Sequence, residues 1–172
     1  MIDINAFTPH TIYTICIVAT PEQVWQALTT AEFSQKYFSG FAVELDEHVG
    51  GRFVLRAPDG SEHISGEVLV CERPTRLSVT FNVNWPGLVE ALGQTLVSYD
   101  IEEAGDAVGL TMTESGERPI DEDIRSGGAT GWPAILSGLK SLLETGKAPA
   151  IRMEPPARML AALKRLGIKT PE

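Results

Sequence analysis

The chain has 172 residues, of which 43% are hydrophobic and 22% charged. These values are typical of one globular domain and exclude disordered and fibrous proteins. The formal net charge of −9 repels phosphate backbones, so we expect no nucleic acid as a partner. Apolar runs are far shorter than the ~20 residues of a membrane-spanning helix, and the N-terminus shows no signal-peptide pattern. We therefore expect no membrane contact and a cytoplasmic location.

The first predicted strand covers residues 11–18, where apolar and polar residues alternate. A helix follows at once, because Thr20-Pro21-Glu22-Gln23 has the pattern of a capping box, with proline in the first helical position. Thr30 is expected to cap a second short helix, which ends at Gly40. Two short helices are therefore predicted after the first strand.

Six further strands are predicted in the middle of the chain, each bounded by turn signals such as Gly50-Gly51 and Pro58-Asp59-Gly60. Their ranges are 42–45, 52–57, 63–72, 76–83, 94–103 and 108–115. Their spacing fits an antiparallel meander. Between the strands predicted at 76–83 and 94–103, residues 85–92 carry apolar side chains at a spacing of three and four. We interpret this stretch as a short amphipathic lid over a cavity mouth or as a dimer contact.

A long amphipathic helix is predicted after the strands, because apolar residues recur at a spacing of three and four over residues 132–143. Three glycines within residues 127–131 and Pro133 weaken the helix before that run, so the pattern does not define its start. Gly146 ends it. The expected fold is α+β, a curved antiparallel sheet of about seven strands wrapped on a long helix in the C-terminal half. Such a sheet leaves a cavity beside the helix.

Residues 1–146 form the predicted domain, and residues 147–172 form a basic C-terminal extension with a short helix over residues 158–166. The extension has six basic residues against two acidic ones, a charge of +4 beside −13 for the rest of the chain. Opposite charges predict that this tail docks on its own body or on a second copy. Its helix carries an apolar stripe of Met159, Leu163 and Leu166. An uncovered stripe of this kind indicates a homodimer through the tail.

Four motifs together resemble one known superfamily. They are Ala19-Thr20-Pro21-Glu22-Gln23-Val24-Trp25, Gly50-Gly51-Arg52-Phe53, Gly66-Glu67-Val68 with Arg73-Pro74-Thr75-Arg76-Leu77, and Gly131-Trp132 with Leu136, Leu139 and Leu142. Over residues 11–146 the chain resembles the SRPBCC or START-like superfamily, with the helix-grip fold of the Bet v 1 allergen, and within it the homologues of heat-shock protein 90 ATPase activators. The resemblance implies that fold. It also implies ligands such as lipids, hormones or polyketides, cyclase activity in some members, and a role in the stress response.

No pattern in the sequence indicates a metal site, a cofactor or a catalytic set of residues. The histidines, His10, His48 and His63, have neither the spacing nor the carboxylate neighbours of a zinc site. Cys16 and Cys71 lie in strand-like runs without a C-x-x-C pattern, so we interpret both as buried, reduced thiols. We therefore expect no metal, no cofactor and no catalytic residues.

The residues expected to line the cavity are mainly aromatic. They are Tyr37, Phe38, Phe53, Phe81, Trp85, Tyr99, Met112, Glu114, Trp132 and Leu136. Core packing is the first explanation for Phe53, whereas Trp85 and Trp132 are flanked by proline or glycine and are expected at the cavity mouth. Because side chains alternate between the two faces of a strand, Glu114 lies on the same face as Met112, at the rim of the cavity. The other explanation of Glu114 is an exposed carboxylate at the end of a strand.

These features favour non-catalytic binding of a small apolar ligand, because burial of apolar surface drives such binding. The alternative, implied by the resemblance, is a protein-binding module that acts on a chaperone ATPase through the acidic sheet or the basic tail. The third hypothesis is a polyketide cyclase-like enzyme in which Glu114 or a pocket tyrosine transfers a proton.

Overall fold

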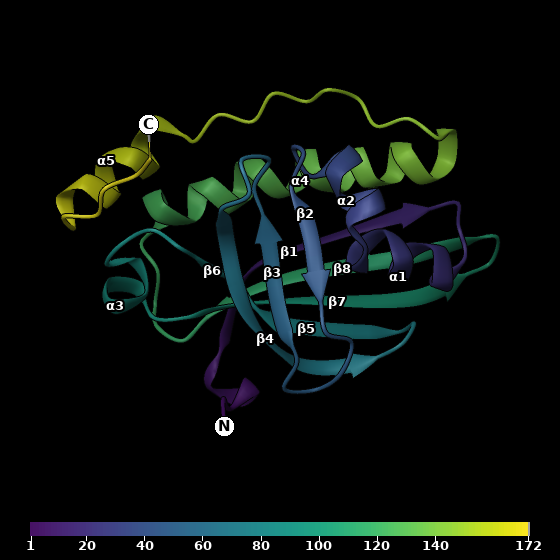
Figure 1. Ribbon diagram of the computed structural model, residues 1–172, viewed down its shortest axis with the longest axis horizontal. Helices are drawn as coiled ribbons and strands as arrows, with labels where there is room; N and C mark the ends of the chain where they lie inside the picture. The colour runs from purple at the N-terminus through teal and green to yellow at the C-terminus, as the bar shows by residue number, and fades with distance from the viewer. Residues whose placement is uncertain (172) are drawn as a thin grey trace.

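The structure is a computed structural model that describes residues 1–171. An antiparallel sheet curves around one long helix, α4 (Glu122–Thr145), in the expected helix-grip arrangement (Figure 1). The strands are β1 (Thr8–Ile17), β2 (Ala42–Leu45), β3 (Arg52–Arg56), β4 (Glu62–Glu72), β5 (Arg76–Thr80), β6 (Asn82–Val83), β7 (Thr95–Ala104) and β8 (Ala107–Gly116). Their order is β1-β8-β7-β5-β4-β3-β2, and β6 pairs with β4 outside this path.

The other helices are shorter than α4 (Figure 1). They are the 3-10 turn η1 (Ile4–Ala6), α1 (Pro21–Thr29), α2 (Ala31–Tyr37), α3 (Leu88–Leu92) and α5 (Ala157–Arg165). The predicted capping box is confirmed, because the Gln23 backbone N–H donates to Thr20 Oγ1 (3.2 Å) and the Thr20 N–H donates to Gln23 Oε1 (2.9 Å). Thr30 precedes α2 as expected, but its hydroxyl donates back to the Gln26 carbonyl oxygen (2.8 Å) and does not cap α2.

The strand expected over residues 76–83 is divided into β5 and β6, because the sheet bends where β4 crosses Thr80. β4 pairs with β6 at Ile64 and with β5 from Val68 onward. Between these positions, a Cβ atom on Gly66 would overlap the carbonyl oxygen of Thr80. Glycine is the residue that permits this close approach of two backbones. The sheet therefore has eight strands in the described chain, where about seven were expected.

The hydrophobic core fills the concave side of the sheet, between the strands and α4. Trp25 of α1, Met112 of β8 and Leu139 of α4 are fully buried there. None of the helices in residues 1–171 combines the length and the apolar character that a membrane span requires. Bulky side chains such as these thus occupy the middle of the grip.

Helix α4 also covers the free edge of β1. The Lys140 ammonium donates to the carbonyl oxygen of Cys16 (2.7 Å), and the Tyr13 hydroxyl donates to the carbonyl oxygen of Ala129 (3.2 Å). A covered edge is protected from pairing with another strand. Cys16 and Cys71 are both free thiols, but the side chain of Cys16 is exposed, so its predicted burial is wrong. Strand parity accounts for this, because Cys16 lies on the outward face of β1.

The N-terminal half of α4 is helical despite its glycines. The Asp121 carboxylate begins the helix by accepting the backbone N–H of Asp123 (2.8 Å). A Cβ atom on Gly127 would overlap the sulfur of Met159 in α5, and one on Gly128 would lie 2.6 Å from a carboxyl oxygen of Glu114. Two of the glycines that weaken the helix locally, Gly127 and Gly128, therefore leave room for neighbouring side chains.

After α4 the chain turns back along this helix, and α5 lies beside its first turns (Figure 1). The guanidinium groups of Arg158 and Arg165 approach the Asp123 carboxylate to 3.9 and 3.6 Å. These exposed pairs stabilise the contact only weakly. Leu163 is 2% exposed, so apolar burial holds the helix. The charge pattern predicts that the tail docks on the body of its own chain or on a second copy. In the structure the tail docks on the body of its own chain.

The apolar stripe of the tail helix is largely covered by this docking. Met159 packs at Gly127 and Leu163 is buried, whereas Leu166 is exposed. The stripe therefore no longer argues for a homodimer, because the chain itself supplies most of the cover.

Candidate ligand-binding site

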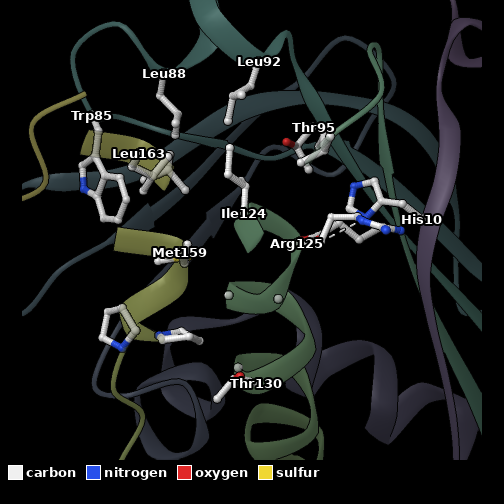
Figure 2. Close-up of a pocket in the computed structure, with 18 of the residues that line it drawn as sticks. His10, Trp85, Leu88, Leu92, Thr95, Ile124, Arg125, Thr130, Met159 and Leu163 are labelled. Carbon is white, nitrogen blue, oxygen red and sulfur yellow. Dashed lines mark ion pairs between the residues drawn. The ribbon is translucent and has the colours of Figure 1, made fainter. Parts of the chain in front are cut away.

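A cavity of about 310 Å³ lies where the first half of α4 meets the strands, α3 and α5 (Figure 2). Its wall is mainly apolar and includes Leu88, Leu92, Ile124, Met153, Met159 and Leu163. The volume is within the ~300–1,000 Å³ of small-molecule sites. The site is assembled from segments far apart in the sequence, which α4 and the strands hold in place.

Helix α3 forms the wall where a lid was expected. Leu88 and Leu92 point from it into the cavity, with Trp85 to one side (Figure 2). The loop after β8 supports α3, because the Arg118 guanidinium donates to the carbonyl oxygen of Glu90 (3.1 Å). This helix is only five residues long.

The C-terminal tail forms the opposite wall. Met153 and Pro156 line the cavity ahead of α5, and Met159 and Leu163 line it from α5 itself. The missing side chain at Gly127 makes room for the Met159 sulfur. Residues beyond 146 therefore complete the site, although the sequence placed them in an extension outside the predicted domain of residues 1–146.

One end of the cavity is polar. His10 of β1, Glu114 of β8 and Arg125 of α4 line it, and His10 and Arg125 lie side by side there (Figure 2). His10 Nδ1 is 3.1 Å from the Thr11 hydroxyl and 3.8 Å from Glu114 Oε1. Burial, together with the positive charge of Arg125, lowers the pKa of His10 below 6.5. Both effects favour the neutral form of the His10 ring.

Glu114 is a buried carboxyl group with one hydrogen-bond donor. Its side chain is 14% exposed, and its Oε2 accepts the indole N–H of Trp132 (3.0 Å). Burial raises the pKa of Glu114 above the ordinary value of 4.5, although the hydrogen bond from Trp132 opposes that rise. The alternative of an exposed carboxylate at a strand end is wrong, because Gly128 of α4 packs against this group.

The raised pKa of Glu114 predicts a pH-dependent stability. Between 4.5 and its folded pKa, the folded protein binds more protons at this site than the unfolded chain. The contribution is therefore fully present below pH 4.5 and is lost as the pH rises through the folded pKa. In Glu114→Gln the amide oxygen can still accept the Trp132 N–H, so we expect a smaller fall in stability from pH 4.5 to pH 8 than in the wild type.

Urea unfolding at several pH values measures this difference. Glu102→Gln removes an exposed carboxylate of β7 and serves as the matched control, which should follow the wild type. Parallel stability profiles for Glu114→Gln and the wild type would contradict the assignment of the buried carboxyl group.

A second cavity of about 270 Å³ shares Glu114, Met153 and the glycines of α4 with the first. Aromatic rings form much of its wall, and the Trp132 ring centroid lies 6.1 Å from that of Phe38 and 5.7 Å from that of Phe81. His63 also lines it. The Glu114 carboxyl group is therefore common to both cavities.

The ten residues expected at the cavity divide into four groups. Trp85 and Glu114 line the larger cavity, and Phe38, Phe81, Trp132 and again Glu114 line the second. Tyr37 lines a separate hollow beside residues 149–153. Phe53, Tyr99, Met112 and Leu136 are buried in the core. Core packing, the first explanation given for Phe53, is what the structure shows.

Sequence reasoning missed two polar residues and the tail. His10 precedes the predicted start of the first strand, and Arg125 lies in a stretch where glycines obscure the start of the helix. The apolar stripe on the tail helix was a usable signal, but its partner surface was not identifiable. Within the part of the chain that the structure describes, no cluster of three or more His, Cys, Asp or Glu side chains could hold a metal ion.

Known proteins resemble this chain in sequence pattern and in fold. The family described as activator of Hsp90 ATPase homolog 1-like protein matches residues 18–144. The crystal structure of protein MLL2253 from Mesorhizobium loti is 27% identical, with a TM-score of 0.63 over 77% of this chain and 96% of that one. The solution structure of the Aha1 dimer from Colwellia psychrerythraea is 23% identical, with a TM-score of 0.65 over 80% and 97% of the two chains.

A third similar structure is the crystal structure of CalU16 from Micromonospora echinospora. It is 21% identical, with a TM-score of 0.61 over 78% of this chain and 74% of that one. No curated protein matches the chain significantly in sequence. The family match ends at residue 144, so α5, which walls the larger cavity, lies beyond the matched residues.

Proposed function

Because this chain belongs to the family of activator of Hsp90 ATPase homolog 1-like proteins, within the SRPBCC or Bet v 1-like superfamily, we propose that it binds a small, largely apolar ligand. The observation that carries this proposal is the cavity of about 310 Å³ between α3, α4 and α5. It has mainly apolar walls and a polar end formed by His10, Glu114 and Arg125, and a small number of polar groups in an apolar wall is the usual design of a small-molecule site.

Apolar burial is the driving force of the proposed binding. Each buried CH₂ contributes ~0.8 kcal/mol, so about ten carbons contribute on the order of 8 kcal/mol before the costs of association. Met153 and Met159 suit such a wall, because flexible thioether side chains adapt to ligands of different shape.

Titration with the neutral fluorescent probe N-phenyl-1-naphthylamine tests the proposal. We expect saturable binding to the wild type, and a loss of at least about tenfold in affinity for Leu88→Trp, because the larger ring fills the cavity from α3. Glu90→Trp places the same ring on the exposed side of α3 and is the matched control. Failure of the probe to bind the wild type, or equal affinity for both variants, would contradict this location.

A second candidate function is a protein-binding module, which the family description and the similarity to the Aha1 dimer favour. It predicts that the protein raises the ATPase rate of a heat-shock chaperone of the Hsp90 class. An unchanged rate at saturating protein would count against this role.

A further inference from the structure

Arg125 differs from the other arginines of the chain. Within residues 1–171, the arginines at 52, 56, 73, 76, 152, 158 and 165 form ion pairs, and Arg118 donates to a carbonyl oxygen. Among these described residues, Arg125 alone has neither kind of partner, and its Nε atom is buried. An Nε–H group that is buried without an acceptor is costly, so its presence requires an explanation.

Two other buried nitrogen atoms of the cavity lack partners. They are Nε2 of His10 and Nε1 of Trp85, and both residues line the same space as Arg125. The Thr11 hydroxyl contacts Nδ1 of His10. In the tautomer in which this hydroxyl donates to Nδ1, the ring proton is on Nε2, which then donates into the cavity. His10 and Arg125 lie next to each other at one end of the cavity, whereas Trp85 lies at the other side (Figure 2). The paired donors at one end therefore define a place for an acceptor group.

The carboxyl group already present does not satisfy these donors. Glu114 Oε2 accepts the Trp132 N–H, and its Oε1 is 3.8 Å from His10, on the Nδ1 side of the ring. Arg125 has no ion pair with Glu114. Arg125 is also the one Lys or Arg among the described residues that line this cavity. The Arg125 side chain therefore lines the cavity without an ion pair of its own, although Glu114 and Glu154 also line it.

We propose that the cavity binds a monocarboxylate with an apolar body, whose carboxylate oxygens accept hydrogen bonds from Arg125 and His10 while its body extends toward α3 and α5. This proposal rests on the proposed binding of an apolar ligand and specifies its head group. A planar carboxylate takes two N–H donors at once. A doubly charged phosphate would be repelled more strongly by Glu114, so a singly charged head fits this end better.

Isothermal titration calorimetry with octanoate and 1-octanol tests the head group, because the two molecules share an eight-carbon body. For the full-length wild type at pH 7.5, we expect octanoate to bind about tenfold to hundredfold more tightly than 1-octanol. Arg125→Met should remove this preference and leave the affinity for 1-octanol unchanged. Arg125→Lys keeps the charge without the fork of donors, so it should retain part of the preference.

Arg76→Met is the matched control, because it removes an exposed positive charge of β5 remote from the cavity and should keep the full preference. Equal affinities of the wild type for octanoate and 1-octanol would overturn the carboxylate assignment and leave apolar binding intact. A preference that survives in Arg125→Met would overturn it as well. Absence of binding by both molecules and by the naphthylamine probe would overturn the proposed function itself.

Discussion

A Leu163→Ala variant is expected to release the C-terminal tail from the body of the protein. Leu163 is 2% exposed and lines the cavity from α5, and truncation of such a side chain costs about 2–5 kcal/mol. A loss of about 3 kcal/mol reduces the ratio of docked to undocked tail about a hundredfold. The effect is local, because the sheet and α4 keep their own core.

Hydrogen–deuterium exchange of the α5 amides measures the release, and binding of the naphthylamine probe reports its effect on the cavity. We expect faster exchange in α5 and weaker probe binding, since one wall of the site is lost. Leu160→Ala lies on the exposed side of the same helix and should change stability by less than about 0.5 kcal/mol. Unchanged protection of α5 in Leu163→Ala would show that this side chain does not hold the tail.

Gly66→Ala is expected to destabilise the whole domain by about 3 kcal/mol or more. The added Cβ atom would overlap the carbonyl oxygen of Thr80, and a backbone atom cannot rotate away as a flexible side chain can. Either the contact between β4 and β5 opens or the bend of the sheet changes, and both disturb the core. Thermal and urea unfolding monitored by circular dichroism measure the loss.

Gly109→Ala provides the matched control within the same sheet. A Cβ atom there would lie 3.9 Å from its nearest neighbour, the carbonyl oxygen of Glu102, which is ordinary van der Waals contact. This variant should therefore be as stable as the wild type or slightly more stable, because glycine weakens a strand. Equal stability of the Gly66 and Gly109 variants would exclude a steric requirement for glycine in β4.

Much of the fold was predictable because the signals involved are local. The capping box at Thr20 lies within four residues. The alternation of apolar and polar residues that predicts a strand requires fewer than about ten residues. The long helix was recognised from the apolar repeat after Trp132. Its first turns were not, because glycine has a low helix propensity, whereas Gly127 and Gly128 leave room for Met159 of α5 and Glu114 of β8 in the folded protein. The packing of distant segments here outweighs helix propensity.

The candidate site was predicted only in part, for a related reason. Strand parity correctly placed Glu114 on the inward face of β8. The spacing of apolar residues over 85–92 indicated an amphipathic stretch, where the structure has α3. Parity does not indicate how far along the sheet a cavity lies. Phe53 and Met112 also point inward, but neighbouring side chains fill the space around them. The position of the cavity thus depended on the volumes of residues from several elements.

The sequence by itself determined the α+β class, the helix-grip arrangement, the capped first helix and the inward position of Glu114, because these follow from repeats and motifs within short segments. Only the tertiary structure decided that the tail walls the cavity and that His10, Glu114 and Arg125 meet at its end. His10 and Glu114 are separated by more than one hundred residues along the chain. Their proximity arises from the pairing of β1 with β8 and from the packing of α4, which no local pattern encodes.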